Sequence, residues 1–105
     1  ADVVVVAYGS TARAARDAVL AARERGVRAG LLRLVTVWPF DADRVGRIIK
    51  AARLVVVPEM NLGQVHGEVL KATRGLQAEV RKVNRVDGCA ITPQEILEAM
   101  GRGLA

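Results

Sequence analysis

The sequence predicts an α/β protein, a three-layer α/β/α sandwich built on a mostly parallel four-stranded sheet. Strand-sized aliphatic runs alternate with segments of helical periodicity four times along the 105 residues. Such alternation is typical of parallel strands whose connecting helices cover both faces of the sheet. No linker or low-complexity stretch interrupts it, so residues 1–105 are predicted to form one domain. We expect the strand order 2-1-3-4.

The first strand and helix follow directly from the N-terminal residues. Val3 to Ala7 is an aliphatic run typical of a strand buried on both faces. A helix is predicted from about Ala12 to Arg25, and Gly26 stands where a C-cap glycine is expected. Small residues dominate the apolar stripe of this helix and allow close packing on the sheet: Ala12, Ala15, Val19 and Ala22.

The second unit is a strand over Ala29 to Val37 followed by a helix. Arg33 interrupts the strand and indicates an edge or a polar side. Asp41 is a predicted helix cap, and Asp43 lies in the first turn, where the helix dipole favours it. The helix is expected to turn Val45, Ile48, Ile49 and Ala52 to the core and to expose Arg44, Arg47 and Lys50.

The third unit opens with a buried strand over Leu54 to Val57. Pro58 is expected to end this strand, because proline has no N–H for the ladder. Asn61 is a plausible N-cap, and Gln64 three residues later completes a variant of the capping box. The helix is expected to reach a C-cap at Gly75, with an apolar face of Leu62, Val65, Val69 and Leu70 and with Thr73 near its end.

The fourth unit begins with alternating apolar and charged residues from Ala78 to Val83, a pattern typical of a half-exposed edge strand. The last helix has a clear start, with Thr92 as N-cap, Pro93 at the first helical position and Glu95 completing a capping box. Its inward residues are predicted to be Ile96, Leu97 and Met100.

Three loops should meet at one edge of this sheet, because the carboxyl ends of parallel strands lie together. These loops are Tyr8 to Thr11, Trp38 to Phe40 and Pro58 to Asn61. Any function is expected there, and we interpret the loops as an interface for another domain. The aromatic loop, Trp38 to Phe40, can instead bury its two aromatic side chains as a hydrophobic plug beneath itself. The interface candidates are Tyr8, Gly9, Ser10, Thr11, Trp38, Pro39, Phe40, Glu59, Asn61, Gly63 and Gln64.

No catalytic constellation accompanies these loops. The Gly9-Ser10-Thr11 turn can hold a phosphate at a helix N-terminus, but it lacks the dinucleotide and P-loop patterns. Glu59 can act as a base if desolvated, yet no partner acid, nucleophile or metal cluster is visible beside it. The single histidine, His66, gives Ser10 no evident triad. We therefore predict no catalytic, cofactor-binding or metal-binding residue.

The net charge, the aromatic content, the length of the apolar runs and the cysteine count narrow the function classes further. The net charge is +5, but the arginines are dispersed and only three aromatic residues are present, which favours a solvated surface over a nucleic-acid interface. The surplus of positive charge can also face an acidic partner domain. The longest apolar run, Val3 to Tyr8, is too short to cross a membrane. The one cysteine, Cys89, fits a buried thiol and a reducing cytoplasm.

Three motifs occur in order: VAYGSTA at residues 6–12, LVTVWPF at 34–40 and VPEMNLGQ at 57–64. Together they resemble the C-terminal domain of the alpha subunit of 2-oxoacid:ferredoxin oxidoreductases, and the third resembles the 2-oxoglutarate branch more than the pyruvate branch. The resemblance covers nearly the whole chain. It implies the fold of a transketolase C-terminal domain. The abrupt start at Ala1 likewise favours a C-terminal fragment of a longer alpha subunit over an ordinary trimmed N-terminus.

The resemblance also implies the chemistry of the whole enzyme. Such an enzyme decarboxylates a 2-oxoacid on thiamine diphosphate with Mg²⁺, passes electrons through an iron–sulfur cluster to ferredoxin, and forms an acyl-CoA. The implied partners are the upstream alpha-subunit domain and the beta subunit, and the implied location is the cytoplasm. No cofactor is expected to bind this fragment, which alone is expected to be inactive.

Two other interpretations stay open from the sequence. One is a stand-alone flavodoxin-like module that binds a nucleotide or phosphate at Gly9-Ser10-Thr11. The other is the related domain of a transketolase or 2-oxoacid dehydrogenase, which shares the fold.

Overall fold

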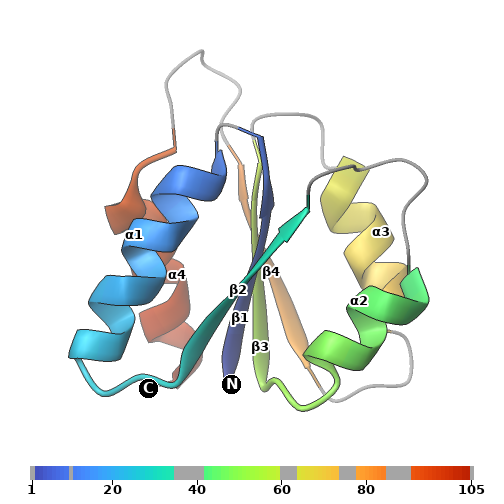
Figure 1. Cartoon of the computed structure of the whole chain (residues 1–105), viewed down its shortest axis with the longest axis horizontal. Helices are drawn as coiled ribbons and strands as arrows, with labels where there is room; N and C mark the ends of the chain where they lie inside the picture. The colour runs from blue at the N-terminus through green and yellow to red at the C-terminus, as the bar shows by residue number, and fades with distance from the viewer. Residues whose placement is uncertain are drawn as a thin grey trace.

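The chain folds into four strands and four helices that alternate in the computed structural model, which describes residues 2–9, 11–34, 42–59, 64–73, 78–84 and 91–104. The elements in chain order are β1 (Val3–Tyr8), α1 (Thr11–Glu24), β2 (Ala29–Leu34), α2 (Ala42–Ile49), β3 (Leu54–Glu59), α3 (Gln64–Ala72), β4 (Glu79–Asn84) and α4 (Pro93–Leu104) (Figure 1).

The strands form one parallel sheet in the order β2-β1-β3-β4, which confirms the predicted topology. β1 pairs along its whole length with β2, from Val3 opposite Ala29 to Tyr8 opposite Leu34. β3 pairs in the same way with β4, from Leu54 opposite Glu79 to Glu59 opposite Asn84. The two outer strands are β2 and β4, as their charged residues predicted.

Two apolar cores lie on opposite faces of the sheet. Figure 1 shows α1 and α4 on one face and α2 and α3 on the other. Alternate residues of β1 divide between the cores, with Val3 and Val5 facing α1 and α4, and Val4 and Val6 facing α2 and α3. Burial on both faces explains why β1 and β3 are almost purely aliphatic.

The C-terminal end of α1 depends on local hydrogen bonds around Gly26, the C-cap glycine that the sequence predicted. After α1, Gly26 has a φ of +86°. Its N–H bonds to the carbonyl of Arg23 at 3.0 Å, and the N–H of Val27 bonds to the carbonyl of Ala22 at 3.0 Å. This pair of bonds is a Schellman motif, which glycine favours because it tolerates positive φ.

Three sequence predictions are wrong. Pro58 does not end β3, because it is buried and pairs with Val83 inside the strand. The pairing of β1 with β3 has already ended at Val56, so a residue without an N–H is tolerated there. Ile48 and Leu70 were expected in the core, but they are 44% and 47% exposed. The predicted caps Asp41, Asn61 and Gly75, together with Leu62 and Cys89, lie outside the described residues.

Candidate functional site

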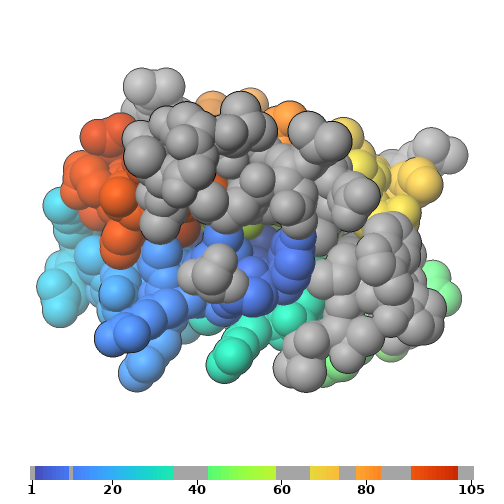
Figure 2. Space-filling model, turned by 90° about the horizontal axis from the view of Figure 1, so that it is seen from above, coloured from blue at the N-terminus to red at the C-terminus, as the bar shows by residue number. Residues whose placement is uncertain are grey.

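The carboxyl edge of the sheet brings together the ends of the strands and the starts of the helices that follow them. Tyr8 lies opposite Leu34 at the ends of β1 and β2, and Glu59 lies opposite Asn84 at the ends of β3 and β4. Figure 2 looks down on this edge, where the start of α1 and the end of β2 reach the surface. The strand ends and helix starts that flank the predicted loops thus lie together at this edge.

The turn from β1 to α1 is closed by its own hydrogen bonds. Gly9 has a φ of +59°, in the left-handed region that glycine adopts without strain. The hydroxyl of Thr11 donates to the carbonyl of Tyr8 at 2.8 Å, and the N–H of Ala12 donates to the carbonyl of Gly9 at 3.2 Å. Thr11 is buried, so its hydroxyl holds the turn and does not face a ligand.

The other predicted interface residues divide into two groups. Tyr8 is half-buried and packs against the core beneath α2 and α3. Glu59 ends β3 and Gln64 begins α3, so both belong to the carboxyl edge. The remaining interface candidates lie outside the described residues: Ser10, Trp38, Pro39, Phe40, Asn61 and Gly63.

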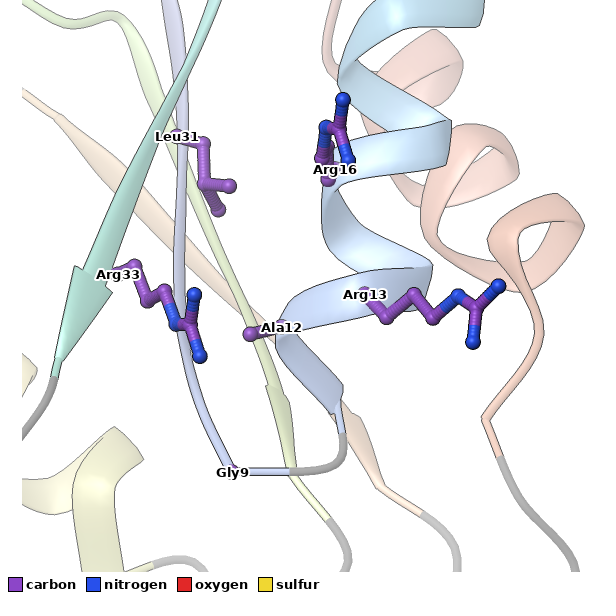
Figure 3. A pocket seen from close by; sticks show the side chains of 6 residues that line it. All are labelled: Gly9, Ala12, Arg13, Arg16, Leu31 and Arg33. Atoms are coloured by element: carbon purple, nitrogen blue, oxygen red, sulfur yellow. The ribbon is translucent and has the colours of Figure 1, made fainter.

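Sequence reasoning missed a pocket between α1 and β2. Arg13 and Arg16 of α1 and Arg33 of β2 line it, and its remaining lining residues are Gly9, Ala12 and Leu31 (Figure 3). The signal was weak, because the three arginines are widely spaced and look dispersed in the sequence. Only the parallel pairing of β1 with β2 brings Arg33 beside the start of α1, with Ala7 opposite Arg33.

The described part of the chain lacks a candidate metal centre. It contains no group of three or more His, Cys, Asp or Glu side chains placed to hold a metal ion. Within the same residues, no helix has the length and apolar character needed to cross a membrane. The site therefore consists of a self-contained turn, strand ends and an arginine-lined pocket.

Comparison with known proteins identifies clear relatives. The family model described as pyruvate:ferredoxin oxidoreductase core domain II matches residues 1–96. Over 97 residues the chain is 39% identical to the 2-oxoglutarate synthase subunit KorA of Methanothermobacter marburgensis, covering 92% of this chain and 26% of that protein. It is 37% identical to the ketoisovalerate oxidoreductase subunit VorB of Methanothermobacter thermautotrophicus, over 93% of this chain and 27% of the relative. The chain thus spans about a quarter of the length of these relatives.

Two solved structures share the fold. A chain of the 2-oxoglutarate:ferredoxin oxidoreductase from Magnetococcus marinus, solved with 2-oxoglutarate, coenzyme A and succinyl-CoA bound, superimposes with a TM-score of 0.83 at 22% identity, over 100% of this chain and 18% of that one. A split-gene transketolase, described as an inactive beta4 tetramer, gives a TM-score of 0.84 at 22% identity, over 98% of this chain and 38% of the other. The transketolase-like fold that the sequence motifs implied is therefore confirmed.

Proposed function

Because the chain belongs to the pyruvate:ferredoxin oxidoreductase core domain II family, we propose that it is the C-terminal domain of the alpha subunit of a 2-oxoacid:ferredoxin oxidoreductase. The observation that carries this proposal is the family match, which extends over residues 1–96 and includes all three sequence motifs. The family resemblance that the motifs predicted is thereby confirmed. A stand-alone flavodoxin-like module is not favoured, since it accounts for none of these matches.

The reaction proposed for the whole enzyme is the oxidative decarboxylation of 2-oxoglutarate to an acyl-CoA with reduction of ferredoxin. Relatives named for 2-oxoglutarate and for ketoisovalerate are nearly equally similar to this chain, at 39% and 37% identity. The choice of 2-oxoglutarate therefore depends on the third motif, residues 57–64. A cytoplasmic location belongs to the same proposal and depends on the scarcity of cysteine.

We infer that other parts of the enzyme hold thiamine diphosphate and its Mg²⁺. Magnesium is usually held through one or two carboxylates together with phosphate oxygens. In support, the described residues contain no group of three or more His, Cys, Asp or Glu side chains placed to hold a metal ion. The hydroxyl of Thr11 already donates its hydrogen bond to the carbonyl of Tyr8. We therefore assign this domain no step of the reaction, and we propose a structural role at the carboxyl edge, against the preceding alpha-subunit domain or the beta subunit.

The activity is tested on the full-length protein expressed with its partner subunit. Reduction of ferredoxin is measured with CoA and each of three 2-oxoacids: 2-oxoglutarate, pyruvate and ketoisovalerate. We expect the highest kcat/KM with 2-oxoglutarate. A preference for ketoisovalerate would overturn the substrate assignment alone, whereas no reduction with any 2-oxoacid would overturn the enzyme class.

The interface role has a separate test with matched controls. The double variant Trp38→Ala, Phe40→Ala is expected to lower the amount of beta subunit that co-purifies with the full-length protein. Leu20→Ala and Leu70→Ala are the controls, since both remove exposed apolar side chains of α1 and α3 away from the proposed interface. Equal co-purification of all four proteins, counting the unmodified one, would show that the aromatic loop is no interface.

A further inference from the structure

The pocket between α1 and β2 has the size of a small-molecule site. Its volume is about 610 Å³, and ligand pockets in proteins usually measure roughly 300–1,000 Å³. A helix, an outer strand and the Gly9 turn line this half-open pocket, so three separate elements contribute to its walls. The three arginines of this pocket have no part in the structural role proposed for the domain, although its Gly9 is also one of the interface candidates.

Among the residues that the structure describes, none balances the charge of the pocket. Arg13, Arg16 and Arg33 are exposed and bring three guanidinium charges to one hollow. None of the three makes an ion pair or a hydrogen bond with another residue that the structure describes. Like charges around one hollow repel each other, and a bound anion removes that repulsion.

We propose that this pocket binds a small molecule that carries two or more phosphate groups. Figure 3 shows Arg33 extending from β2 toward α1, and Arg16 on α1 one turn beyond Ala12. Arg13 extends away from Arg33 and lies at the rim. Arg16 and Arg33 thus stand on the two walls of the pocket. Arginine binds phosphate oxygens with two parallel hydrogen bonds, so each wall supplies one phosphate contact.

The rest of the lining suits the ligand that the arginines select. Ala12 and Leu31 provide an apolar surface for the organic part of such a molecule. Gly9 has no neighbouring atom within 4 Å of the place where a Cβ would stand, which leaves room beside the backbone. The first turn of α1 adds the positive end of a helix dipole. A concave pocket lined by a helix, a strand and a turn fits a compact ligand better than an extended acidic segment.

The proposal is tested by isothermal titration of the full-length protein with inorganic pyrophosphate and with inorganic phosphate. Saturable pyrophosphate binding is expected, with weaker binding of phosphate. In the double variant Arg16→Ala, Arg33→Ala, one binding event should lose roughly tenfold or more in affinity, as expected when charge-assisted hydrogen bonds are removed. Arg47→Ala of α2, which removes an exposed arginine on the other face of the sheet, should leave it unchanged.

A third variant and a second ligand complete the experiment. Arg33→Lys keeps the charge but not the paired donors, so it should lose part of the affinity even if the double variant does not fold. A glutamate-rich peptide is titrated in parallel. Pyrophosphate binding that neither Arg33→Lys nor the double variant weakens overturns the proposal. Peptide binding through Arg16 and Arg33 without pyrophosphate binding overturns it too, and assigns the pocket to an acidic protein segment. Either result leaves the assignment of the 2-oxoacid oxidoreductase untouched.

Discussion

A Cβ atom placed on Gly46 of α2 would lie 3.2 Å from the carbonyl oxygen of Ala72 on α3. The two helices lie together on one face of the sheet and share a core with β1 and β3. A contact this short requires the backbone of α3 to move, because the carbonyl belongs to the helix itself. The absence of a side chain at position 46 therefore sets how closely α2 and α3 pack.

Gly46 and Gly67 form a matched pair for testing this close approach. At Gly67 of α3, nothing lies within 4 Å of the place where a Cβ would stand. Gly67→Ala should therefore raise the free energy of unfolding by about 1 kcal/mol, since alanine is the better helix former. Gly46→Ala should raise the free energy of unfolding by clearly less, and Gly46→Val should lower it. Urea unfolding of the 105-residue chain measures all three, and a Gly46→Val variant as stable as the parent would contradict the close contact.

The start of α4 gives a second prediction. The N–H of Glu95 bonds to the hydroxyl of Thr92 at 3.2 Å, and the N–H of Thr92 bonds to Oε1 of Glu95 at 3.3 Å. This reciprocal pair is the capping box that the sequence predicted. Thr92→Ala should lower the free energy of unfolding by about 1 kcal/mol, whereas Thr92→Ser should retain most of it. Thermal unfolding of the two variants separates the loss of the hydroxyl from the loss of the methyl group.

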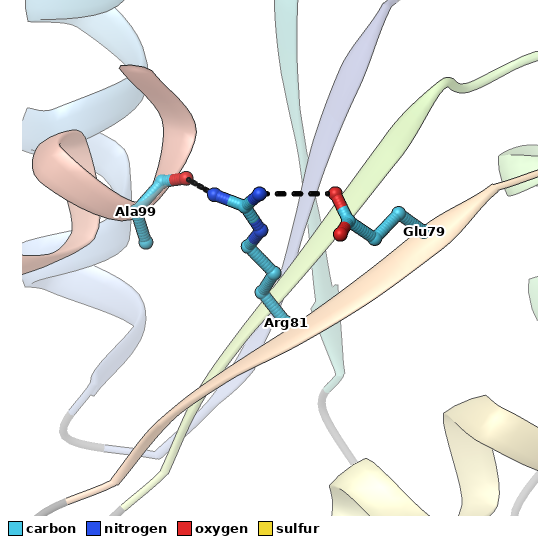
Figure 4. Close-up of polar contacts among 3 residues, drawn as sticks. All are labelled: Glu79, Arg81 and Ala99. Carbon is cyan, nitrogen blue, oxygen red and sulfur yellow. Dashed lines mark hydrogen bonds and ion pairs between the residues drawn. The ribbon is translucent and has the colours of Figure 1, made fainter. Parts of the chain in front are cut away.

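Arg81 gives a third prediction, because it connects β4 to α4. Its Nη1 donates to the carbonyl of Ala99 at 3.1 Å, and its Nη2 lies 3.2 Å from Oε2 of Glu79 (Figure 4). Glu79 is exposed, and exposed ion pairs contribute little, so Glu79→Gln should change the free energy of unfolding by less than about 0.5 kcal/mol. Arg81→Met should cost about 1 kcal/mol or more, since it also removes the bond to α4. Equal losses in urea unfolding would show that the ion pair, and not the bond to Ala99, carries the effect.

The order of the strands could be predicted because the amino-acid composition of each strand reflects whether it lies in the middle or at the edge of the sheet. Val3 to Ala7 and Leu54 to Val57 are aliphatic throughout, which suits the two central strands, whereas Arg33 and Arg81 mark the outer ones. The end of α1 at Gly26 and the start of α4 at Thr92 were predictable for a similar reason, since the residues that form each cap are neighbours in the sequence.

Features that depend on neighbours distant in sequence were not predictable. Pro58 remains in β3 only because the pairing with β1 ends before it, at Val56, which the composition of β3 does not reveal. Ile48 and Leu70 have the spacing of core residues, but their neighbours Ile49 and Val69 take the buried positions and leave both exposed. Arg13, Arg16 and Arg33 form one pocket only after β2 pairs with β1.

The packing of α1 gives the last prediction. Ala15 and Ala18 are fully buried in the core between α1, α4 and the sheet, whereas Ala14 and Ala21 are half-buried at its margin. The predicted stripe of small residues is confirmed, with Ala18 as an additional member. Two added methyl groups at Ala18 have no free space, so they must push α1 away from α4 or from β1.

Ala18→Val should lower the free energy of unfolding by about 1–3 kcal/mol more than Ala21→Val. Both substitutions carry the same loss of helix propensity, so the difference between them isolates overpacking. Urea unfolding of the 105-residue chain gives this difference directly. Similar losses at the two positions would mean that α1 shifts on the sheet without cost, and that the alanine stripe does not fix its distance from β1.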